Sequence, residues 1–160
     1  MLVKLLNNIK VNFSNTIEVI SAAVGQNADL VGFYCPSMNN SGNNQVSLNK
    51  NESQIYSPQI RLDMLFDKLG INQIDLIKID VEGYEKFVLD GIDFKRVKPK
   101  NILLEVIPEQ LRNFSSSADD IRSFLEIEGY SCSDIFGNVI SSFDSIPEDN
   151  ILFTLSERID

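Results

Sequence analysis

The sequence contains no histidine and only two cysteines, Cys35 and Cys132, in 160 residues. Without histidine there can be no Ser-His-Asp or Cys-His catalytic centre and no histidine-ligated zinc. A general base in this protein must therefore be a carboxylate, a lysine or a tyrosine. The two cysteines stand far apart and form no Cys-x-x-Cys pair. We interpret them as reduced, partly buried thiols, with a disulfide as the alternative.

A concentration of basic residues is also missing, because 14 Lys and Arg face 23 Asp and Glu for a formal net charge of -9. Binding to a phosphate backbone needs a Lys/Arg cluster, and an anionic membrane surface attracts the same residues. The apolar opening Met1–Leu6 is too short to span a bilayer and lacks the parts of a signal peptide. We therefore expect a cytoplasmic protein with no nucleic-acid and no membrane partner.

Hydrophobic residues make up 43% of the chain, which is enough for one domain over residues 1–160 with a real core. Alternation and β-branched runs predict strands over Thr16–Val24, Leu30–Cys35, Gln59–Leu62, Ile74–Ile79, Asn101–Ile107, Tyr130–Asp134 and Ile151–Leu155. Helical spacing and capping signals predict helices over Leu2–Ile9, from a cap at Asp63 to Leu69, from Gly83 to about Leu89, and from a capping box at Ser117 to Glu128.

The order of these elements indicates an α/β fold, because strands that are apolar throughout are typical of a sheet covered by helices on both faces. The segment 36–53 is rich in Asn, Ser and Gly and is interpreted as a flexible insertion.

The run DLIKIDVEGYE at residues 75–85 carries the candidate chemistry. Asp80 falls at the carboxyl end of its strand, where open α/β sheets bind ligands, and Glu82 and Glu85 lie in the first turn of the next helix. Three acids gathered there could accept a proton, orient a hydroxyl or bind a hard divalent cation. The alternative is structural: Asp80 caps the helix, Glu82 pairs with Lys86, and Glu85 is solvated.

Lys78 and Glu105 are each a charge inside an apolar strand, and the two strands are expected to be neighbours. An unpaired buried charge is costly, so the pattern predicts a buried ion pair between them, with a direct role towards substrate as the alternative. The four tyrosines are interpreted as packing residues rather than catalysts; they are Tyr34, Tyr56, Tyr84 and Tyr130.

The longer run IDLIKIDVEGYEKFVLDGI resembles the signature of the FkbM family of methyltransferases. That signature is a hydrophobic strand, Lys-Ile-Asp-Val-Glu-Gly, one variable residue, Glu, and a helix ending in Leu-x-Gly. The matching residues are Lys78, Asp80, Glu82, Gly83, Glu85, Leu89 and Gly91. The likeness extends to Ala23-Val24-Gly25, Leu62-Asp63, the ILLEV run at 102–106, and Gly129-Tyr130.

The resemblance implies an S-adenosylmethionine-dependent methyltransferase with a Rossmann-like class I sheet, acting on a hydroxyl of a small molecule or glycan. It places Ala23 on the adenine side of the cofactor and Asp80 near its sulfonium and the reacting centre. Glu82 would be the base or a metal ligand, and Glu105 its supporting group; no metal site is assigned. The family's first two strands, with their glycine-rich loop and Glu-Pro, have no counterpart here. We therefore expect an incomplete sheet and weak cofactor binding by this chain alone.

The family's implied strand order, 3-2-1-4-5-7-6, puts the missing strands between Thr16–Val24 and Ile74–Ile79. The second of these is too apolar for a natural sheet edge. We expect the vacancy to be filled by Thr16–Val24, by a second copy in a homodimer, or by a complementing N-terminal segment. Other functions remain open: a non-catalytic remnant or binding module with this fold, and a divalent-metal hydrolase that uses the three acids.

Overall fold

A computed structural model describes residues 2–12, 16–34, 45–47, 55–140 and 149–156. Its elements in chain order are α1 (Leu2–Asn12), β1 (Ala23–Val24), β2 (Asp29–Tyr34), β3 (Gln45–Ser47), β4 (Ile55–Ile60), α2 (Leu62–Leu69), β5 (Leu76–Ile79), α3 (Glu85–Leu89), β6 (Asn101–Val106), α4 (Pro108–Asn113), α5 (Ala118–Ile127), β7 (Tyr130–Asp134) and β8 (Asp149–Leu155).

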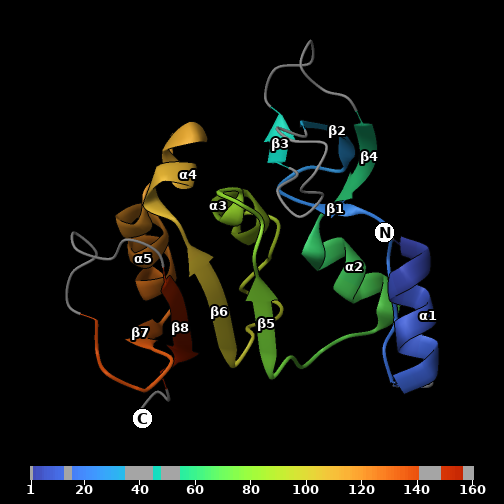
Figure 1. Ribbon diagram of the computed structural model, residues 1–160. Helices are drawn as coiled ribbons and strands as arrows, with labels where there is room; N and C mark the ends of the chain where they lie inside the picture. Colours follow the sequence, from blue (N-terminus) through green and yellow to red (C-terminus); the bar gives the residue numbers. More distant parts are fainter. Residues whose placement is uncertain (1, 13–15, 35–44, 48–54, 141–148, 157–160) are drawn as a thin grey trace.

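The strands form two mixed sheets, so the chain has a mixed α/β fold (Figure 1). The first sheet has the order β1-β4-β2-β3, with β1 parallel to β4 and the other pairs antiparallel. The second sheet has the order β5-β6-β8-β7, with β5 parallel to β6 and β8 antiparallel to both its neighbours. Figure 1 shows β5 at the edge of its sheet that lies nearest β1 and α2.

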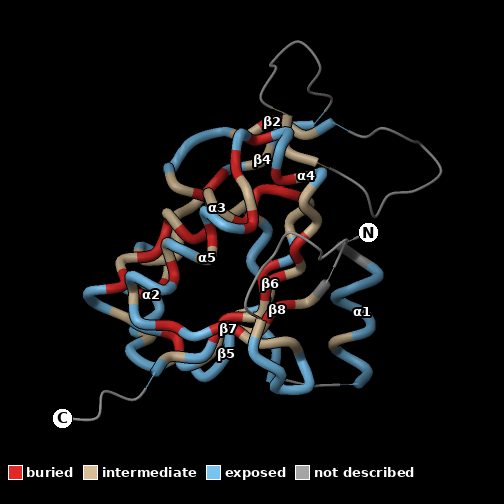
Figure 2. The backbone as a smooth tube through the Cα atoms, turned by 90° about the vertical axis from the view of Figure 1, so that its left-hand side faces the viewer, coloured by how far each residue is buried: buried red, intermediate tan, exposed pale blue. Residues whose placement is uncertain are grey.

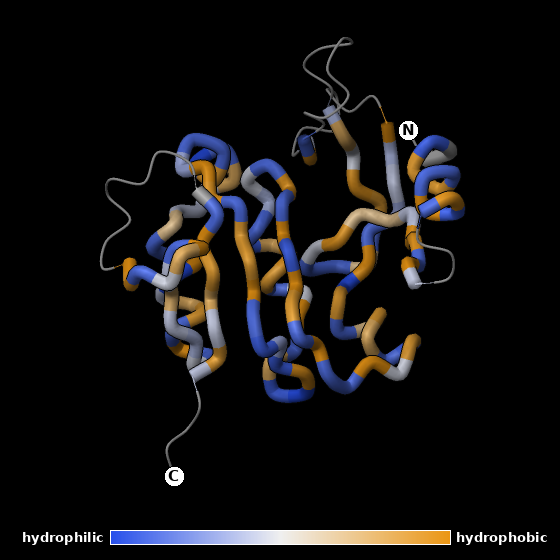
Figure 3. Tube along the Cα trace, turned by 60° about the horizontal axis from the view of Figure 1, so that its bottom comes forward, coloured by the Kyte–Doolittle hydropathy of each residue, from blue (hydrophilic) through white to orange (hydrophobic). Residues whose placement is uncertain are grey.

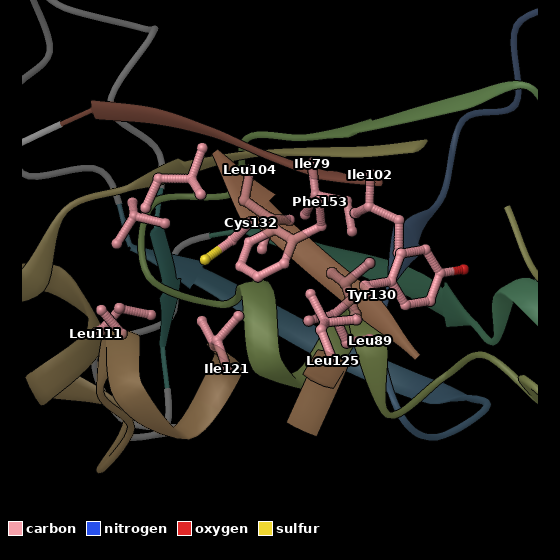
Figure 4. Packing of buried hydrophobic residues seen from close by; sticks show 14 of the residues in the cluster. Ile79, Leu89, Ile102, Leu104, Leu111, Ile121, Leu125, Tyr130, Cys132 and Phe153 are labelled. Carbon is pink, nitrogen blue, oxygen red and sulfur yellow. The ribbon is translucent and has the colours of Figure 1, made fainter. Parts of the chain in front are cut away.

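The hydrophobic core covers one face of the second sheet. Along β6 every second side chain is buried, and the register sets Ile102 beside Ile77 of β5 and Phe153 of β8. Helices α3, α4 and α5 contribute residues to the same cluster, as Figure 4 shows for Leu89, Leu111, Ile121 and Leu125. Figure 2 shows the buried positions concentrated on these strands and helices.

The expectation that helices cover both faces is wrong for the described part of the chain. On the opposite face of the second sheet, Lys78 is exposed, and Leu103 and Glu105 are only half-buried. The buried apolar residues of α3, α4 and α5 belong to the same cluster as Ile102 and Leu104 on the first face. Alternation of buried and partly buried residues along β6 is the pattern of a sheet with one packed face.

Helix α1 adds almost nothing to the core. Leu5 and Leu6 are each nearly half exposed, and Val11 is mostly exposed. Figure 2 shows α1 as largely exposed, and Figure 3 shows hydrophobic positions scattered along it beside the N-terminus. The prediction of a helix near the start of the chain is confirmed, but its apolar stripe contributes little burial.

The strand predicted over Thr16–Val24 is mostly wrong, because only Ala23–Val24 is extended in a sheet. A β-branched run becomes a strand only where a partner is available, and β4 offers two residue pairs here. Helix α4 was not predicted. The insertion expected at 36–53 lies mostly outside the described residues, and within it Gln45–Ser47 forms β3.

Two capping predictions have different outcomes. The capping box at Ser117 is confirmed, since its hydroxyl accepts from the Asp120 amide and the Asp120 carboxylate accepts from the Ser117 amide. Asp63 does not cap α2, because the N-cap is Arg61 and Asp63 lies in the first turn, where it forms an ion pair with Arg61.

The packing of the second sheet predicts a sharp contrast between neighbouring leucines. Leu104→Ala should lower the free energy of unfolding by about 2–5 kcal/mol, because it opens a cavity in the packed core. Leu103→Ala, one residue earlier on the uncovered face, is the matched control and should cost clearly less. Urea denaturation of both variants measures the difference. Equal losses would show that both faces are covered.

Candidate functional site

Strand β5 presents its charged side chains on the uncovered face. Ile79 points into the core, so Lys78 and Asp80 point the other way. The Lys78 ammonium lies 2.8 Å from Asp80 Oδ2, and the two side chains are 52% and 41% exposed. The predicted buried pair of Lys78 with Glu105 is therefore wrong. Lys78 is solvent-exposed, and its ion-pair partner is Asp80, the first residue after its own strand.

Asp80 also meets Glu105 from the neighbouring strand β6. The hydrogen bond with Asp80 is the main reason why the pKa of Glu105 lies above its usual value. Lys78 first, and Glu105 second, hold the pKa of Asp80 below its usual value. Two carboxyl groups this close cannot both be ionised easily. The pair therefore ionises first at Asp80, and Glu105 keeps its proton to higher pH.

The turn between β5 and α3 has an unusual backbone. Glu82 has φ 54° and Gly83 has φ 99°, so two successive residues lie in the left-handed region. A Cβ on Gly83 would lie 2.6 Å from the main-chain oxygen of Gln110, which leaves room only for glycine. The Gln110 side-chain amide donates to the Glu82 carboxylate, so α4 holds Glu82 in place.

This geometry excludes two of the structural alternatives for the acids. The N-cap of α3 is Tyr84 and no side-chain cap bond is present, so Asp80 does not cap the helix. Glu82 is bonded to Gln110, whereas Lys86 pairs with Asp90 one turn later on α3.

Glu85 is not solvated, as the third structural alternative held; it is 1% exposed. Its Oε1 accepts from the main-chain amides of Gly83 at 3.1 Å and Val81 at 3.4 Å. Burial raises the pKa of its carboxyl group. The sequence signal for this role was the Gly-x-Glu spacing, which lets the first-turn carboxylate fold back onto the turn.

A cavity of about 310 Å³ opens between the two sheets, and it gathers three of the four predicted site residues. Ala23 stands on one wall, and Asp80 and Glu82 stand on the other. Glu105 is absent from the lining and lies against Asp80 instead. The lining that sequence reasoning missed is Ala22, Val24, Phe33, Val46, Val81 and Tyr84.

Close contacts of α3 with the first sheet join the two walls. A Cβ on Gly91 would lie 2.4 Å from the main-chain oxygen of Gly25, so the end of α3 touches the backbone that follows β1. Arg61 bonds to the main-chain oxygens of Gln26 at 2.6 Å and Asp90 at 3.3 Å. These contacts give a physical reason for the glycine at the end of the Leu-x-Gly motif.

Tyr84 links the cavity to the core. Its ring stacks on Phe87 with centroids 4.5 Å apart and meets Phe114 edge-on, which confirms the packing role expected of it. Its hydroxyl donates to Gln59 Oε1 at 3.3 Å, and the buried Gln59 donates in turn to the Asn27 carbonyl at 2.9 Å. Tyr84 therefore supports the cavity wall.

A second hollow of about 280 Å³ runs along β5. Among the described strands only β6 pairs with β5, and β1 pairs with β4, so the predicted move of Thr16–Val24 into the vacancy does not occur. The hollow is lined mainly by aliphatic side chains, with one ion pair; the lining is Val24, Leu62, Ile77, Lys78, Ile79, Asp80, Val81 and Val88.

The described residues contain no metal-binding cluster and no membrane-spanning helix, and one of their thiols is free. No group of three or more Asp, Glu or Cys side chains is placed to hold a metal ion there. No described helix has the length and apolar character needed to cross a bilayer. Cys132 is buried and free, and Cys35 lies outside the described residues.

Comparison with known proteins gives one family match. Residues 3–132 match the Methyltransferase FkbM domain. One relative, the AMB antimetabolite synthetase AmbE of Pseudomonas aeruginosa, is 36% identical over 74 residues, which cover 46% of this chain. The chain spans only 4% of the length of that relative. No solved structure matches.

The carboxyl pair makes a prediction that NMR can check. Asp80→Asn removes the carboxylate that binds the Glu105 proton and leaves Lys78 nearby, so the pKa of Glu105 should fall towards its usual value. Asp75→Asn is the control, because Asp75 pairs with Lys100 and should leave Glu105 unchanged. Side-chain carboxyl titration by ¹³C NMR measures both. If Asp80→Asn leaves the pKa of Glu105 unchanged, the two carboxyl groups do not interact.

The raised pKa of Glu105 and the lowered pKa of Asp80 change the free energy of unfolding with pH in opposite directions. The raised pKa of Glu105 contributes stability below its unfolded pKa that is lost as pH rises through its folded pKa. The lowered pKa of Asp80 contributes stability above its unfolded pKa that is lost as pH falls through its folded pKa. Asp80→Asn should remove both effects, so the free energy of unfolding should change less with pH in the mildly acidic range.

Proposed function

Because the chain belongs to the FkbM methyltransferase domain family, we propose that it serves S-adenosylmethionine-dependent methyl transfer to a hydroxyl group of a small molecule or glycan. The observation that carries this proposal is the cavity between the sheets, which sets Asp80 and Glu82 opposite Ala23. An apolar wall facing a carboxylate wall suits a ligand with an aromatic base and a positive charge.

The cofactor supplies a methyl group activated by a sulfonium. On this chain, Ala23, Val24 and Phe33 offer an apolar surface to the adenine. Asp80, kept ionised by Lys78, attracts the positive charge, and Glu105 supports Asp80. Glu82 is the cavity carboxylate left to take the proton of the acceptor hydroxyl. Methyl transfer depends mainly on the alignment of the acceptor oxygen with the methyl carbon and the sulfur, which needs the completed site.

We further propose that the fold is an incomplete Rossmann-like sheet. The order β5-β6-β8-β7 equals the last four strands of the order expected from the family resemblance. The apolar hollow along β5 lies between that strand and Val24, which is where two further strands belong. None of the eight glycines lies in an Asp-x-Gly-Ala-x-x-Gly loop, so the glycine-rich turn that lets the backbone come close to the cofactor has to come from elsewhere.

The proposed complement is an N-terminal segment with the two strands and the glycine-rich loop, paired with the open edge of β5. An edge of this kind recruits another strand, because its outer amides and carbonyls pair with no other strand among the described residues. A homodimer is the alternative filling. The relative's name, an antimetabolite synthetase, favours a small-molecule acceptor. The net charge of -9 favours the same conclusion, because it disfavours a nucleic-acid acceptor.

Cofactor binding tests the proposal directly. In calorimetry, the chain alone should show no S-adenosylmethionine binding in the micromolar range, and adding a polypeptide with the family's first two strands and loop should restore it. In that assembly Asp80→Asn should weaken binding by about tenfold or more, because a charge partner is lost. Asp75→Asn, outside the cavity, is the matched control. Binding unaffected by Asp80→Asn would overturn the site assignment.

Hydrogen exchange tests the open edge. In the free chain, amides of β5 that face β6 should exchange slowly and those that face away should exchange fast. The complementing segment should slow the second set. Slow exchange of both sets in a free monomer would show that the edge is already paired. The same result in a dimer, detected by analytical ultracentrifugation, would favour a second copy as the partner.

A further inference from the structure

We infer that Glu85 is a positioning residue, whose buried carboxylate holds the turn that presents Asp80 and Glu82 to the cavity. Its importance for methyl transfer rests on the proposed function, but its effect on the turn can be measured without cofactor or acceptor. Glu85 lies outside the cavity lining and acts through the backbone of its neighbours.

The first support is the direction of the hydrogen bonds. One oxygen, Oε1, accepts from the amides of both Val81 and Gly83, which are the two residues on either side of Glu82. Glu82 itself has φ 54°, a left-handed conformation that is unfavourable for a residue with a side chain. An acceptor that gathers the flanking amides stabilises this conformation, as anions do in backbone nests.

The second support is the burial of the carboxylate without a cation. Glu85 is 1% exposed, and its other oxygen, Oε2, has no partner among the described residues. The charge that acts on it is the like charge of Glu82, whereas Lys86 on the same helix pairs with Asp90. A position needed only for packing would be filled better by an aliphatic side chain, because burying a carboxyl group is costly.

The third support is what the turn carries. The residue before Val81 is Asp80, which meets Lys78 and Glu105, and the residue between the two bound amides is Glu82, which meets Gln110. A turn that relaxed would move both carboxylates at once. Gly83 also packs against the Gln110 backbone, so the turn has little freedom to adopt another shape without losing that contact.

Two substitutions separate positioning from packing. Glu85→Gln keeps an acceptor oxygen, and Glu85→Met fills the space without one. We expect Glu85→Gln to keep slow exchange of the Val81 and Gly83 amides and the raised pKa of Glu105. Glu85→Met should retain the far-ultraviolet circular dichroism spectrum, but these amides should exchange at least about tenfold faster and the pKa of Glu105 should fall. If Glu85→Met folds and changes neither, Glu85 is a packing residue and the inference is wrong.

A measurement on the folded wild-type chain keeps the inference testable if Glu85→Met does not fold. The amide proton shifts of Val81 and Gly83 should titrate together with the Glu85 carboxyl, and this titration should vanish in Glu85→Gln. Shifts that do not follow Glu85 would overturn the inference. A chain that passes these tests but never transfers a methyl group would refute the proposed function alone.

Discussion

The turn from β5 into α3 depends on the close approach of two backbones. Gly83 lies against the main-chain oxygen of Gln110, and the 2.6 Å left for a Cβ excludes every other residue. Because α4 follows β6, this contact ties the ends of two neighbouring parallel strands together. The main-chain amides of Val81 and Gly83 in this turn donate hydrogen bonds to Glu85. The carboxylates that the turn carries, Asp80 and Glu82, line the cavity towards the first sheet. The contact between Gly83 and the Gln110 main chain thus sets the shape of this cavity wall. The shape of the turn in turn sets where the Asp80 and Glu82 carboxylates lie.

The second constraint is that the two faces and the two edges of the second sheet are covered by other residues to different extents. The packed face buries Ile102, Leu104 and Phe153 almost completely, which fixes the register of β5 through its only described neighbour, β6. The other face and the free edge carry Lys78 and Asp80, so the charged groups of the site stand where the sheet is least covered. The packed face therefore supports the strand from one side, and the charged groups lie on its more exposed side.

Local features were predictable from the sequence, and contacts between distant segments were not. The strand, the glycine turn and the capping box at Ser117 depend on residues within a few positions of one another, and all three are present. The pairing of Lys78 depends on which face is covered, and the spacing of charges in two strands does not reveal it. The donor from Gln110 comes 28 residues after Glu82, on a short helix that was not predicted although Pro108 at its start and Glu109 in its first turn are helix signals. Thr16–Val24 has the composition of a strand, but composition does not show whether a neighbouring strand is available to pair with it.

The carboxyl groups around the cavity divide their chemistry according to their neighbours. Asp80 has an ammonium group on one side and a carboxyl group on the other, and both favour its ionised form. A carboxylate stabilised in this way is a poor proton acceptor and a good fixed negative charge. Glu105 keeps its proton to a higher pH and donates a hydrogen bond with it to Asp80. Within the proposed function, Glu82 is therefore the carboxylate left free to accept a proton. Its only described protein partner is the neutral Gln110 amide, which orients the carboxylate without supplying a counter-charge.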